Sequence, residues 1–332
     1  MKILLTGAAG TVGHHVLKQL LDHNYQVTVI ELKTKKNLKA LKPYHQQITL
    51  IWGNITDSDL LNKIIKDQDV VIHLAGLIPP YADSWPELTR QVNYFGTKNI
   101  VSAITKYNPT CFLMFSSSIS VYGDRLNNYQ IKVGDKLKNS DGDYYALVKI
   151  QTEDMIKKSN INHTIFRLTA IMDKPQIDPL MFHMPLDTKL EIATARDTAR
   201  AFVNGIKHKG ILNKNIYNLG GGKKCRTTYR EFLKTCFKIY GLNYNYLDES
   251  AFADKNFHCG YYIDGHILND IVNFQEDTLD SYYQYLSDNT SVIKKNLTKA
   301  LSYFIMWRLN SSSEPKYALQ TNNKVLIKRF FK

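Results

Sequence analysis

Three side chains, Ser118, Tyr145 and Lys149, have the types and the spacing that acid–base chemistry at an oxygen atom requires. Tyr145 and Lys149 are four residues apart in the segment "YALVK", and this spacing places both side chains on one face of a helix. A tyrosine is a poor base at neutral pH, but a neighbouring ammonium group stabilises its phenolate. Tyr145 is therefore a candidate to take a proton from a hydroxyl or return one to a carbonyl, while Ser118 holds the oxygen.

The tyrosine and lysine pair alone is weak support, because the chain contains 21 tyrosines and such spacings arise by chance. The sequence around the pair strengthens the interpretation. Ser118 lies in "SSSISVYG", directly after the apolar run "CFLMF" and 27 residues before Tyr145. We therefore expect Ser118 to end a strand and the other two residues to lie on a later helix.

A glycine-rich loop, "LLTGAAGTVG", lies between a predicted strand over residues 2–6 and a predicted helix over residues 12–22. In that context Gly7 permits a tight turn, Gly10 lets a pyrophosphate approach the backbone, and Gly13 lets the helix pack closely on the strand. The free amide groups at the start of the helix then face the anion. The alternative is an ordinary glycine turn without a ligand.

The next predicted strand, "YQVTVIEL", ends near Glu31, eighteen residues after the last glycine of the loop. An acid at this position accepts hydrogen bonds from the adenosine ribose of a dinucleotide, which favours NAD. Lys33, Lys35 and Lys36 follow directly and suit either a ribose 2′-phosphate, which leaves NADP possible, or a solvated loop. A bound cationic nicotinamide would stabilise the Tyr145 phenolate further and exchange hydride with a substrate.

The alternation of strand and helix continues along the first half of the chain. Strands are predicted in "ITLIWGNI", "DVVIHLAG" and "CFLMFSSS", with helices over residues 58–66 and 85–107 between them. This order implies parallel strands joined by right-handed crossovers, and therefore an α/β fold with a doubly wound parallel sheet. Ligands of such sheets bind at the carboxyl ends of the strands. Those ends carry Asn54, Ile55, Ala75, Gly76 and the serine cluster.

The composition is that of a folded globular protein, with 44% hydrophobic and 22% charged residues among 332. The length favours two lobes. The histidines and the four cysteines lack metal-ligand spacing, so we assign no metal. With no apolar run long enough to span a membrane and no room for a signal peptide, we expect a cytoplasmic protein.

The net charge of +13 suits nucleic acid, an anionic membrane face, a phosphorylated substrate or a lysine-rich surface. Basic and aromatic residues do not interleave on a recognisable nucleic-acid motif. We therefore expect no nucleic-acid partner.

Together these features resemble the extended short-chain dehydrogenases/reductases, the family of NAD-dependent sugar epimerases and dehydratases. The resemblance covers about residues 1–285. It rests on the glycine loop, Glu31, "HLAG", Asn93 in "NYFGT", "SSSISVYG", "YALVK" with Glu153 behind it, "RDTARA" and "YNLGGG". It implies a Rossmann fold that binds NAD, a smaller C-terminal lobe for a small-molecule substrate, and often a homodimer formed by two helices per subunit.

The resemblance also assigns roles to residues. Ser118, Tyr145 and Lys149 become the catalytic triad, and Tyr144 is the less suitable register because only Tyr145 has a lysine four positions later. The cofactor-binding residues would be Gly7, Ala9, Gly10, Thr11, Val12, Gly13, Glu31, Asn54, Ile55, Leu74, Ala75, Gly76, Asn93, Tyr145 and Lys149. The candidate substrate contacts are Ile78, Ser120, Thr169 and Arg226. An arginine such as Arg226 either grips an anionic group or only caps or covers a helix.

Departures from the family pattern narrow the reaction. Ala170 stands three residues after Arg167, where nucleotide-sugar epimerases usually have an asparagine, so a diphosphate contact is missing. The segment 173–193 is shorter than the one that builds their nucleotide pocket. Sugar 4,6-dehydratases have Thr-Asp-Glu where residues 118–120 read "SIS", which disfavours dehydration. Asn54 replaces an aspartate that the family commonly offers to adenine.

We expect an NAD(P)-binding domain over residues 1–171, to whose sheet residues 189–220 return through a strand, a helix and a second strand. The substrate lobe would comprise residues 172–188 and 221–310. Its loop "MDKPQIDPLMFHMPLD" suits an apolar part of the pocket or a packed surface loop. The basic tail, residues 311–332, could lie on an anionic membrane face, although docking on the protein itself or on a second subunit is favoured.

The leading hypothesis is an NAD(P)-dependent oxidoreductase that moves hydride to or from a secondary alcohol or ketone carbon, with Tyr145 as general acid/base. The alternative is an NAD-dependent sugar or nucleotide-sugar epimerase, in which hydride transfer is transient. The missing asparagine and the short segment favour net oxidoreduction. A non-catalytic NAD(P)-binding sensor or scaffold is the alternative of another class, and it predicts a broken triad.

Overall fold

The computed structural model describes residues 1–174, 178–255 and 259–332. Its central sheet has seven strands, all parallel to their neighbours, in the order β10-β7-β5-β4-β1-β2-β3. They are β1 (Lys2–Thr6), β2 (Gln26–Glu31), β3 (Thr49–Trp52), β4 (Val70–His73), β5 (Phe112–Ser118), β7 (Asn162–Leu168) and β10 (Asn215–Leu219). The strand order reverses between β1 and β4, where the crevice of a doubly wound sheet opens. The predicted fold class is confirmed.

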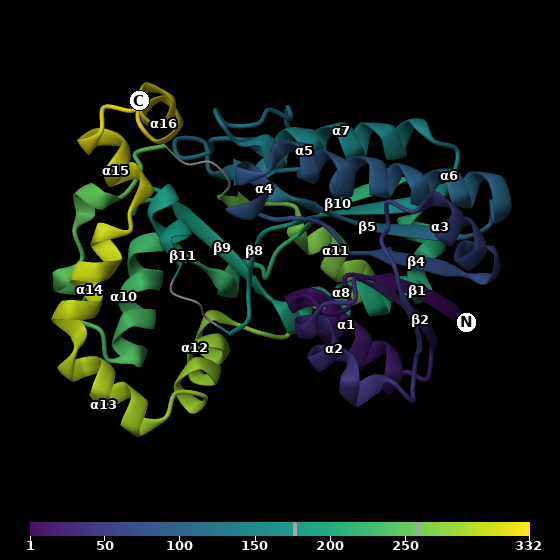
Figure 1. Ribbon diagram of the computed structural model, residues 1–332, viewed down its shortest axis with the longest axis horizontal. Helices are drawn as coiled ribbons and strands as arrows, with labels where there is room; N and C mark the ends of the chain where they lie inside the picture. Colours follow the sequence, from purple (N-terminus) through teal and green to yellow (C-terminus); the bar gives the residue numbers. More distant parts are fainter. Residues whose placement is uncertain (175–177, 256–258) are drawn as a thin grey trace.

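Helices cover both faces of this sheet (Figure 1). α3, α6 and α7 lie over one face, and α1, α8 and α11 lie over the other. The helices of this unit are α1 (Thr11–Asp22), α2 (Lys35–Leu41), α3 (Ser58–Ile64), α4 (Tyr81–Ser84), α5 (Pro86–Thr89), α6 (Thr97–Tyr107), α7 (Tyr144–Lys158), α8 (Ala195–Gly205), α9 (Lys209–Leu212) and α11 (Gly265–Val272). The helix predicted over 85–107 is in fact three segments, because a π-helical stretch, Arg90–Gly96, joins α5 to α6.

Single turns of 3-10 helix connect several of these elements. They are Lys42–Tyr44, Ile65–Asp67, Ile119–Tyr122, Pro179–His183, Ile206–His208, Lys223–Cys225, Tyr244–Tyr246 and Glu249–Ala251.

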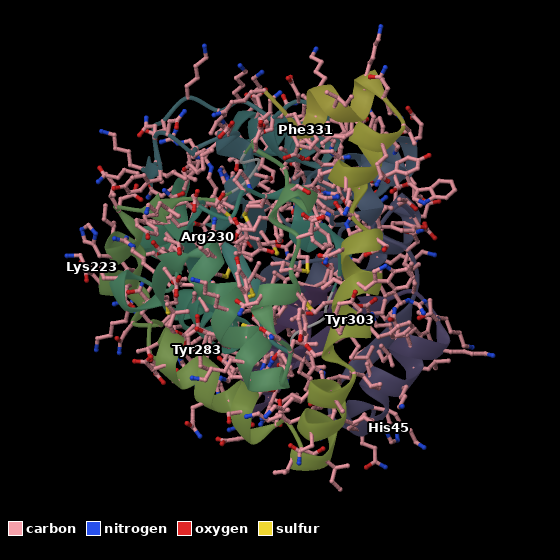
Figure 2. All side chains as sticks on the ribbon, turned by 90° about the vertical axis from the view of Figure 1, so that its left-hand side faces the viewer. His45, Lys223, Arg230, Tyr283, Tyr303 and Phe331 are labelled. Carbon is pink, nitrogen blue, oxygen red and sulfur yellow. The ribbon has the colours of Figure 1, made fainter. Side chains whose placement is uncertain are left out.

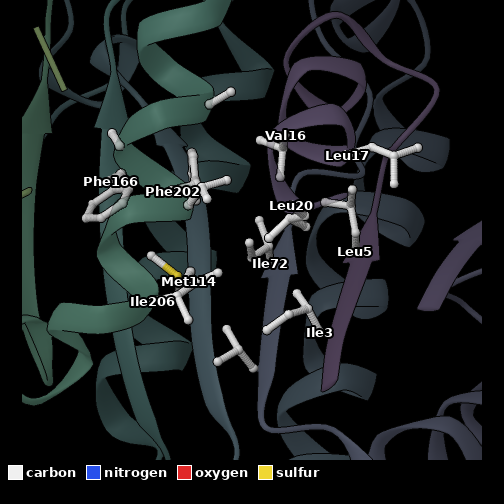
Figure 3. Close-up of a cluster of buried hydrophobic side chains, with 14 of the residues drawn as sticks. Ile3, Leu5, Val16, Leu17, Leu20, Ile72, Met114, Phe166, Phe202 and Ile206 are labelled. Carbon is white, nitrogen blue, oxygen red and sulfur yellow. The ribbon is translucent and has the colours of Figure 1, made fainter. Parts of the chain in front are cut away.

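Apolar side chains fill the space between the sheet and the helices α1 and α8 (Figure 3). Val16, Leu17 and Leu20 recur at helical spacing along α1 and are fully buried. On the other side of the cluster, the ring of Phe202 from α8 packs edge to face on that of Phe166 from β7, with ring centres 5.0 Å apart. This packing fixes α1 on the sheet and thereby positions the glycine loop that precedes it.

A second hydrophobic core lies in the C-terminal lobe, at the left of Figure 1. Its long helices are α10 (Tyr229–Tyr240), α12 (Leu279–Asp288), α13 (Val292–Ala300) and α14 (Ser302–Ser311). Phe232 and Phe237 of α10, Tyr282 of α12 and Met306 of α14 are buried in it. The lobe therefore has a core of its own, separate from that of the seven-stranded sheet.

A three-stranded sheet, in the order β11-β9-β8, connects the two units. Its strands are β8 (Ala170–Met172), β9 (Lys189–Thr194) and β11 (Arg226–Thr228), and a further pair joins β6 (Gln130–Ile131) to β12 (Tyr261–Tyr262). The prediction that the strand over 189–194 returns to the main sheet is wrong, because β9 pairs with β8 and β11. β10 and α8 do lie in the unit of the seven-stranded sheet, where β10 pairs with β7 and α8 packs on α1.

The basic tail forms two short helices, α15 (Glu314–Gln320) and α16 (Lys324–Phe330), that pack on the protein itself. Phe330 is 2% exposed, and its ring lies 4.7 Å from that of His183. Arg329 forms an ion pair of 2.6 Å with Asp83 of α4. Across the described part of the chain, no helix has the length and apolar character needed to cross a membrane.

Candidate active site

The glycine loop adopts a conformation that only small residues permit. Gly7 has a φ of +76°, and a Cβ atom on it would lie 2.7 Å from the Ala75 nitrogen. A Cβ atom on Gly13 would lie 1.9 Å from the Gly7 carbonyl oxygen. Gly10 caps α1 without a side-chain hydrogen bond, so the first amide groups of the helix point into the crevice. The loop is thus built as a cradle for an anion at a helix N-terminus.

Glu31 ends β2 beside this loop. Its Oε1 atom accepts a hydrogen bond from the Ala9 amide at 2.9 Å, and its Oε2 atom accepts one from Asn37 Nδ2 at 3.1 Å. Burial raises the pKa of Glu31, while the hydrogen bonds from the Ala9 and Leu32 amides lower it. The carboxylate is therefore held in place beside the glycine loop. The lysines at 33, 35 and 36 are exposed.

Tyr145 and Lys149 lie one turn apart on the buried face of α7, with exposed fractions of 9% and 6%. Asp143 caps this helix, because its Oδ1 atom accepts a hydrogen bond from the Ala146 amide at 2.8 Å. Lys149 Nζ donates a hydrogen bond to the carbonyl oxygen of Ser116 in β5 at 2.7 Å. The lysine thereby ties α7 to the strand that ends in Ser118.

The Ser118 hydroxyl is oriented by its neighbour two residues later. Its Oγ atom accepts hydrogen bonds from the Ser120 amide at 3.2 Å and from Ser120 Oγ at 3.0 Å. Ser118 also hydrogen-bonds with the side chain of Tyr145, which brings together the two groups predicted to handle a substrate oxygen. Ser120 is thus a support for Ser118 in this structure.

Burial shifts the pKa values of both Tyr145 and Lys149 toward their uncharged forms. Burial raises the pKa of Tyr145, and the hydrogen bond with Ser118 lowers it. Burial lowers the pKa of Lys149 to about 8, against the influence of Glu153, which raises it. Burial thus favours the protonated phenol of Tyr145, and a positive charge next to the ring would favour the phenolate.

One cavity of about 320 Å³ brings most of the predicted residues together. Its lining includes Gly7, Gly10, Thr11, Val12, Gly13, Leu74, Gly76, Ser118, Tyr145 and Lys149, and the candidate substrate residues Ile78 and Thr169. The phosphate cradle and the acid–base pair therefore face the same space. Ser116, Ser117, Leu77, Leu168 and Ile171 also line it. The sequence reasoning missed these residues, although each stands next to or between residues of the motifs that it used.

Several predicted cofactor residues lie outside this lining and support it from behind. Asn93, in the π-helical stretch, binds the backbone of Leu77 twice: Oδ1 accepts from the amide at 2.7 Å and Nδ2 donates to the carbonyl at 2.9 Å. The Ala75 amide donates to Thr6 Oγ1 at 3.1 Å. Asn54 Oδ1 accepts from the Thr56 amide. Cofactor contacts through Ala9, Glu31, Asn54, Ile55, Ala75 and Asn93 stay predictions.

Arg226 lies outside the lining of this cavity, and its side chain is 20% exposed. Its Nε atom lies 2.8 Å from Glu191 Oε2, and Nη2 donates to the Tyr262 carbonyl at 2.6 Å. Glu191 is fully buried, so this ion pair joins β11 to β9 inside the fold. A substrate contact through Arg226 stays a prediction, but the guanidinium already has a carboxylate partner.

A buried ion pair that the sequence did not predict lies behind Ser118, Tyr145 and Lys149. Glu153, one turn after Lys149, pairs with Arg167 of β7 at 2.6 Å. Ser117 Oγ donates to the same carboxylate at 2.5 Å, and Arg167 Nη1 donates to Tyr122 at 2.7 Å. The network links α7, β5 and β7 directly beneath the cavity. Glu153 stood in the quoted motif, but its partner 14 positions later could not be read from spacing.

Sequence comparison places this site in a known family. Residues 3–173, slightly more than half of the chain, match the profile of the NAD dependent epimerase/dehydratase family. The chain belongs to that family. Its members are NAD-dependent enzymes, and NAD is the cofactor that the glycine cradle and the acid at the end of β2 fit.

Three relatives show how far the likeness extends. The chain is 29% identical to mouse 3 beta-hydroxysteroid dehydrogenase type 7 over 43% of its own length and 38% of the relative's. It is 32% identical to a putative UDP-glucose 4-epimerase of Methanocaldococcus jannaschii over 53% of its length and 58% of the relative's. The chain thus spans only about half the length of such curated relatives. A solved UDP-glucuronic acid 4-epimerase of Bacillus cereus shares the fold, with a TM-score of 0.68, 21% identity, and coverage of 87% of this chain and 99% of that one.

Proposed function

We propose that the protein is an NAD-dependent oxidoreductase that transfers hydride at a secondary alcohol or ketone carbon of a small molecule, with Tyr145 as general acid/base. The observation that carries this proposal is the shared cavity, in which Tyr145 and Lys149 face the glycine cradle. The triad is also intact in that position, with Ser118, Tyr145 and Lys149 all present, which argues against a non-catalytic sensor or scaffold.

Each residue has a role that follows from its contacts. NAD, when bound, supplies the hydride acceptor, and NADH supplies the donor. Ser118 orients the reacting oxygen through a hydroxyl that Ser120 holds in place. Tyr145 donates its proton to a carbonyl oxygen in reduction and takes one from a hydroxyl in oxidation. Lys149 stays anchored to Ser116 and presents its ammonium group to the phenol ring, whose centre is 5.6 Å away.

Epimerisation is the alternative that a specific observation favours, since a putative UDP-glucose 4-epimerase is 32% identical over 53% of this chain. Both reactions need the same acid–base pair. They differ in what leaves the site: net oxidation releases one NADH for each substrate, whereas an epimerase restores its NAD in every cycle. Ala170 and the short segment 173–193 favour net oxidoreduction.

A cofactor balance tests the proposal. The purified protein would be incubated with excess NAD and, in separate reactions, with secondary alcohols, free sugars and UDP-glucose, while released NADH and product are both measured. We expect one NADH per molecule of oxidised product. Product formation from UDP-glucose without release of NADH would establish the epimerase instead.

The same preparation tests a homodimer. The family resemblance implies an association through two helices of each subunit. Sedimentation velocity over a range of protein concentrations should then show a species of twice the monomer mass of 38.2 kDa.

A further inference from the structure

A second cavity, of about 390 Å³, lies against the first and shares Thr11 and Ile171 with it. Its walls come from β8, the turn Pro179–His183, α10 and α12. It is thus formed mainly by the C-terminal lobe. The volume is in the range of roughly 300–1,000 Å³ that is usual for sites of small organic ligands. Residues 175–177 of the loop predicted to cover an apolar pocket lie outside the described residues.

The described lining of this second cavity is apolar and adaptable. Methionine and aromatic side chains make up much of it, among them Met172, Met181, Met184, Phe232 and Tyr282. Methionines fill irregular space and adjust to ligands of different shape, because three rotatable bonds carry a polarisable sulfur. The Tyr229 hydroxyl, on the same wall, donates to the Met181 carbonyl at 2.9 Å and is not left for a ligand.

Charges in the described lining do not suit an anion. Asp173, Lys174 and Asp178 are the charged members, which gives a net charge of −1. The two arginines of the adjoining elements already bind carboxylates: Arg226 pairs with Glu191, and Arg230 pairs with Asp187 and Glu249. A diphosphate entering this cavity would lose its hydration and meet a single lysine, Lys174, together with two carboxylates, Asp173 and Asp178, which is unfavourable.

We propose that this second cavity binds the apolar body of the substrate, and that the substrate is a hydrophobic ketone or secondary alcohol without a phosphate group. The proposal deepens the proposed function and rests on it. The reacting carbon lies in the first cavity, and the hydrocarbon part extends past Ile171 into the second. In reduction, the carbonyl carbon receives hydride from NADH and its oxygen receives the Tyr145 proton, giving the alcohol and NAD⁺; Tyr145 regains a proton from water.

A homologous series of methyl ketones, from hexanone to decanone, tests the proposal. The dissociation constants would be measured by calorimetry with NADH present on a Tyr145→Phe variant, so that binding is read without turnover, and KM would be measured on the unmodified protein. Each methylene that enters the cavity should tighten binding about fourfold, equivalent to about 0.8 kcal/mol. UDP-glucose should bind at least about 100-fold more weakly than decanone.

A pair of substitutions at one position localises the effect. Met181→Gln keeps the length of the side chain but adds a buried amide, and should weaken decanone binding about tenfold while leaving the affinity for NADH unchanged. Met181→Leu should change it less than about twofold. If Met181→Gln does not fold, the methyl ketone series measured on the Tyr145→Phe variant still tests whether the second cavity binds the hydrocarbon chain.

The outcomes separate this proposal from the one on which it rests. If binding tightens with each methylene but the unmodified protein reduces none of the ketones, the cavity assignment stands and the oxidoreductase assignment fails. A flat series, or UDP-glucose binding more tightly than decanone, overturns the cavity assignment, whatever the turnover.

A different observation carries a second inference, which concerns the outer face of helices α13 and α14. We call this face the α13–α14 surface. It exposes seven large apolar side chains: Val292, Ile293, Leu297, Leu301, Tyr303, Phe304 and Trp307. Ile293 is 82% exposed and Trp307 is 58% exposed. Figure 2 looks onto this side of the molecule, where Tyr303 is labelled on α14. So dense a group of exposed apolar residues marks an interaction site.

Charge indicates what covers the α13–α14 surface. Lys294, Lys295, Lys299 and Arg308 are exposed on the same two helices. Residues 291–332 as a whole carry nine lysines and arginines and one acid, a net charge of +8. Exposed apolar and aromatic side chains among basic residues match the boundary of an anionic bilayer, where rings enter the headgroup layer and lysines meet the phosphates.

We also infer that the α13–α14 surface binds the surface of an anionic membrane. Sedimentation with vesicles tests this, using phosphatidylcholine alone or with about one third phosphatidylserine. We expect binding to the mixed vesicles that weakens as salt is raised. The double variant Ile293→Ser, Trp307→Ser should lose at least about tenfold in affinity. Ile211→Ser, which changes an equally exposed residue on α9, is the matched control and should bind normally.

Two results would overturn the membrane assignment. The first is equal or absent binding to the two kinds of vesicle. The second is self-association in solution that the double variant abolishes, since a second copy of the chain would then cover this surface.

Discussion

The Lys149 ammonium group lies 5.6 Å from the centre of the Tyr145 ring and is anchored to the Ser116 carbonyl at 2.7 Å. The two side chains occupy one face of α7, where burial raises the pKa of Tyr145 and the hydrogen bond with Ser118 lowers it. The phenol therefore favours its protonated form. Under the proposed function, the positive charge of an oxidised nicotinamide would help to convert it into a base.

Replacement of Tyr145 by phenylalanine should abolish proton transfer while leaving the cofactor site intact. We expect kcat to fall by roughly 10²–10⁴-fold and the NAD dissociation constant to change less than about twofold. Steady-state kinetics and calorimetry measure the two quantities. Tyr144→Phe, one residue earlier on the same helix, is the control and should keep most of the activity. A Tyr145→Phe variant with normal kcat would refute the role of the phenol.

Removal of the Glu153 charge should lower the stability of the fold and change the pH dependence of kcat/KM. Glu153→Gln leaves the buried Arg167 without its carboxylate, which should lower the free energy of unfolding by about 3–5 kcal/mol. Because Glu153 also raises the pKa of Lys149, the variant should lose the Lys149 charge at a pH below about 8. Chemical denaturation and the alkaline limb of kcat/KM report the two effects.

The neighbouring residue on α7 provides the comparison for Glu153. Asp154→Asn removes a carboxylate that is about half exposed and pairs with Lys158. It should change the free energy of unfolding by less than about 1 kcal/mol. Similar losses in the two variants would mean that the buried pair has no special role.

Glu31 should decide between NAD and NADP. The unmodified protein should bind NAD more tightly than NADP, because the fixed Glu31 carboxylate accepts hydrogen bonds from ribose hydroxyls and repels a 2′-phosphate. Glu31→Gln should weaken the binding of NAD about tenfold and tighten the binding of NADP, with both dissociation constants measured by calorimetry. The double variant Lys33→Gln, Lys35→Gln tests the opposing interpretation of this loop. Tighter binding of NADP by the unmodified protein, lost in the lysine variant, would favour that interpretation.

Asp143 should make stability fall as pH rises. Burial raises its pKa to about 7, from 3.8 in an unfolded chain, so the folded protein holds a proton that the unfolded chain releases between about pH 4 and 7. The free energy of unfolding therefore decreases across that window, by on the order of 2–4 kcal/mol from this group. Above about pH 7 its contribution is constant.

The variant Asp143→Asn isolates this contribution, because asparagine still accepts the Ala146 amide. Denaturation at pH 5 and pH 8 should show a smaller loss of stability in the variant than in the unmodified protein. Asp57→Asn alters an exposed cap of α3 and should leave the pH dependence unchanged. Parallel behaviour of Asp143→Asn and the unmodified protein would exclude the effect.

The parts of the site that sequence predicts are those built within one strand and its following helix. Gly7, Gly13, Glu31 and the Tyr145 and Lys149 pair were assigned correctly to their elements, because turn geometry and helical periodicity act over a few residues. Their exact contacts required the structure. The direction of the Lys149 side chain, for example, depends on a carbonyl in β5, 33 positions earlier.

Relationships between distant segments could not be predicted. The Arg226 and Glu191 pair joins two strands that are 35 positions apart, and β9 lies in a different sheet from the one expected. A strand's periodicity shows which of its faces is buried, but not which strand lies beside it. The second cavity is likewise lined by residues from distant parts of the chain, from Thr11 to Tyr282, and only the loop over residues 172–187 was indicated by the sequence.

The ion pair between Arg329 and Asp83 joins residues 246 positions apart, and Asp83 Oδ1 also receives the amide of Tyr145 at 3.4 Å. Helix α16 is thereby connected through Asp83 to the first turn of α7. Proteolytic removal of the residues after Lys324 would take away Arg329. The Asp83 carboxylate, which is only 5% exposed, would then lack its counter-ion next to the first turn of α7. We expect such a cut to shift Tyr145 while leaving every residue that lines the 320 Å³ cavity in the chain.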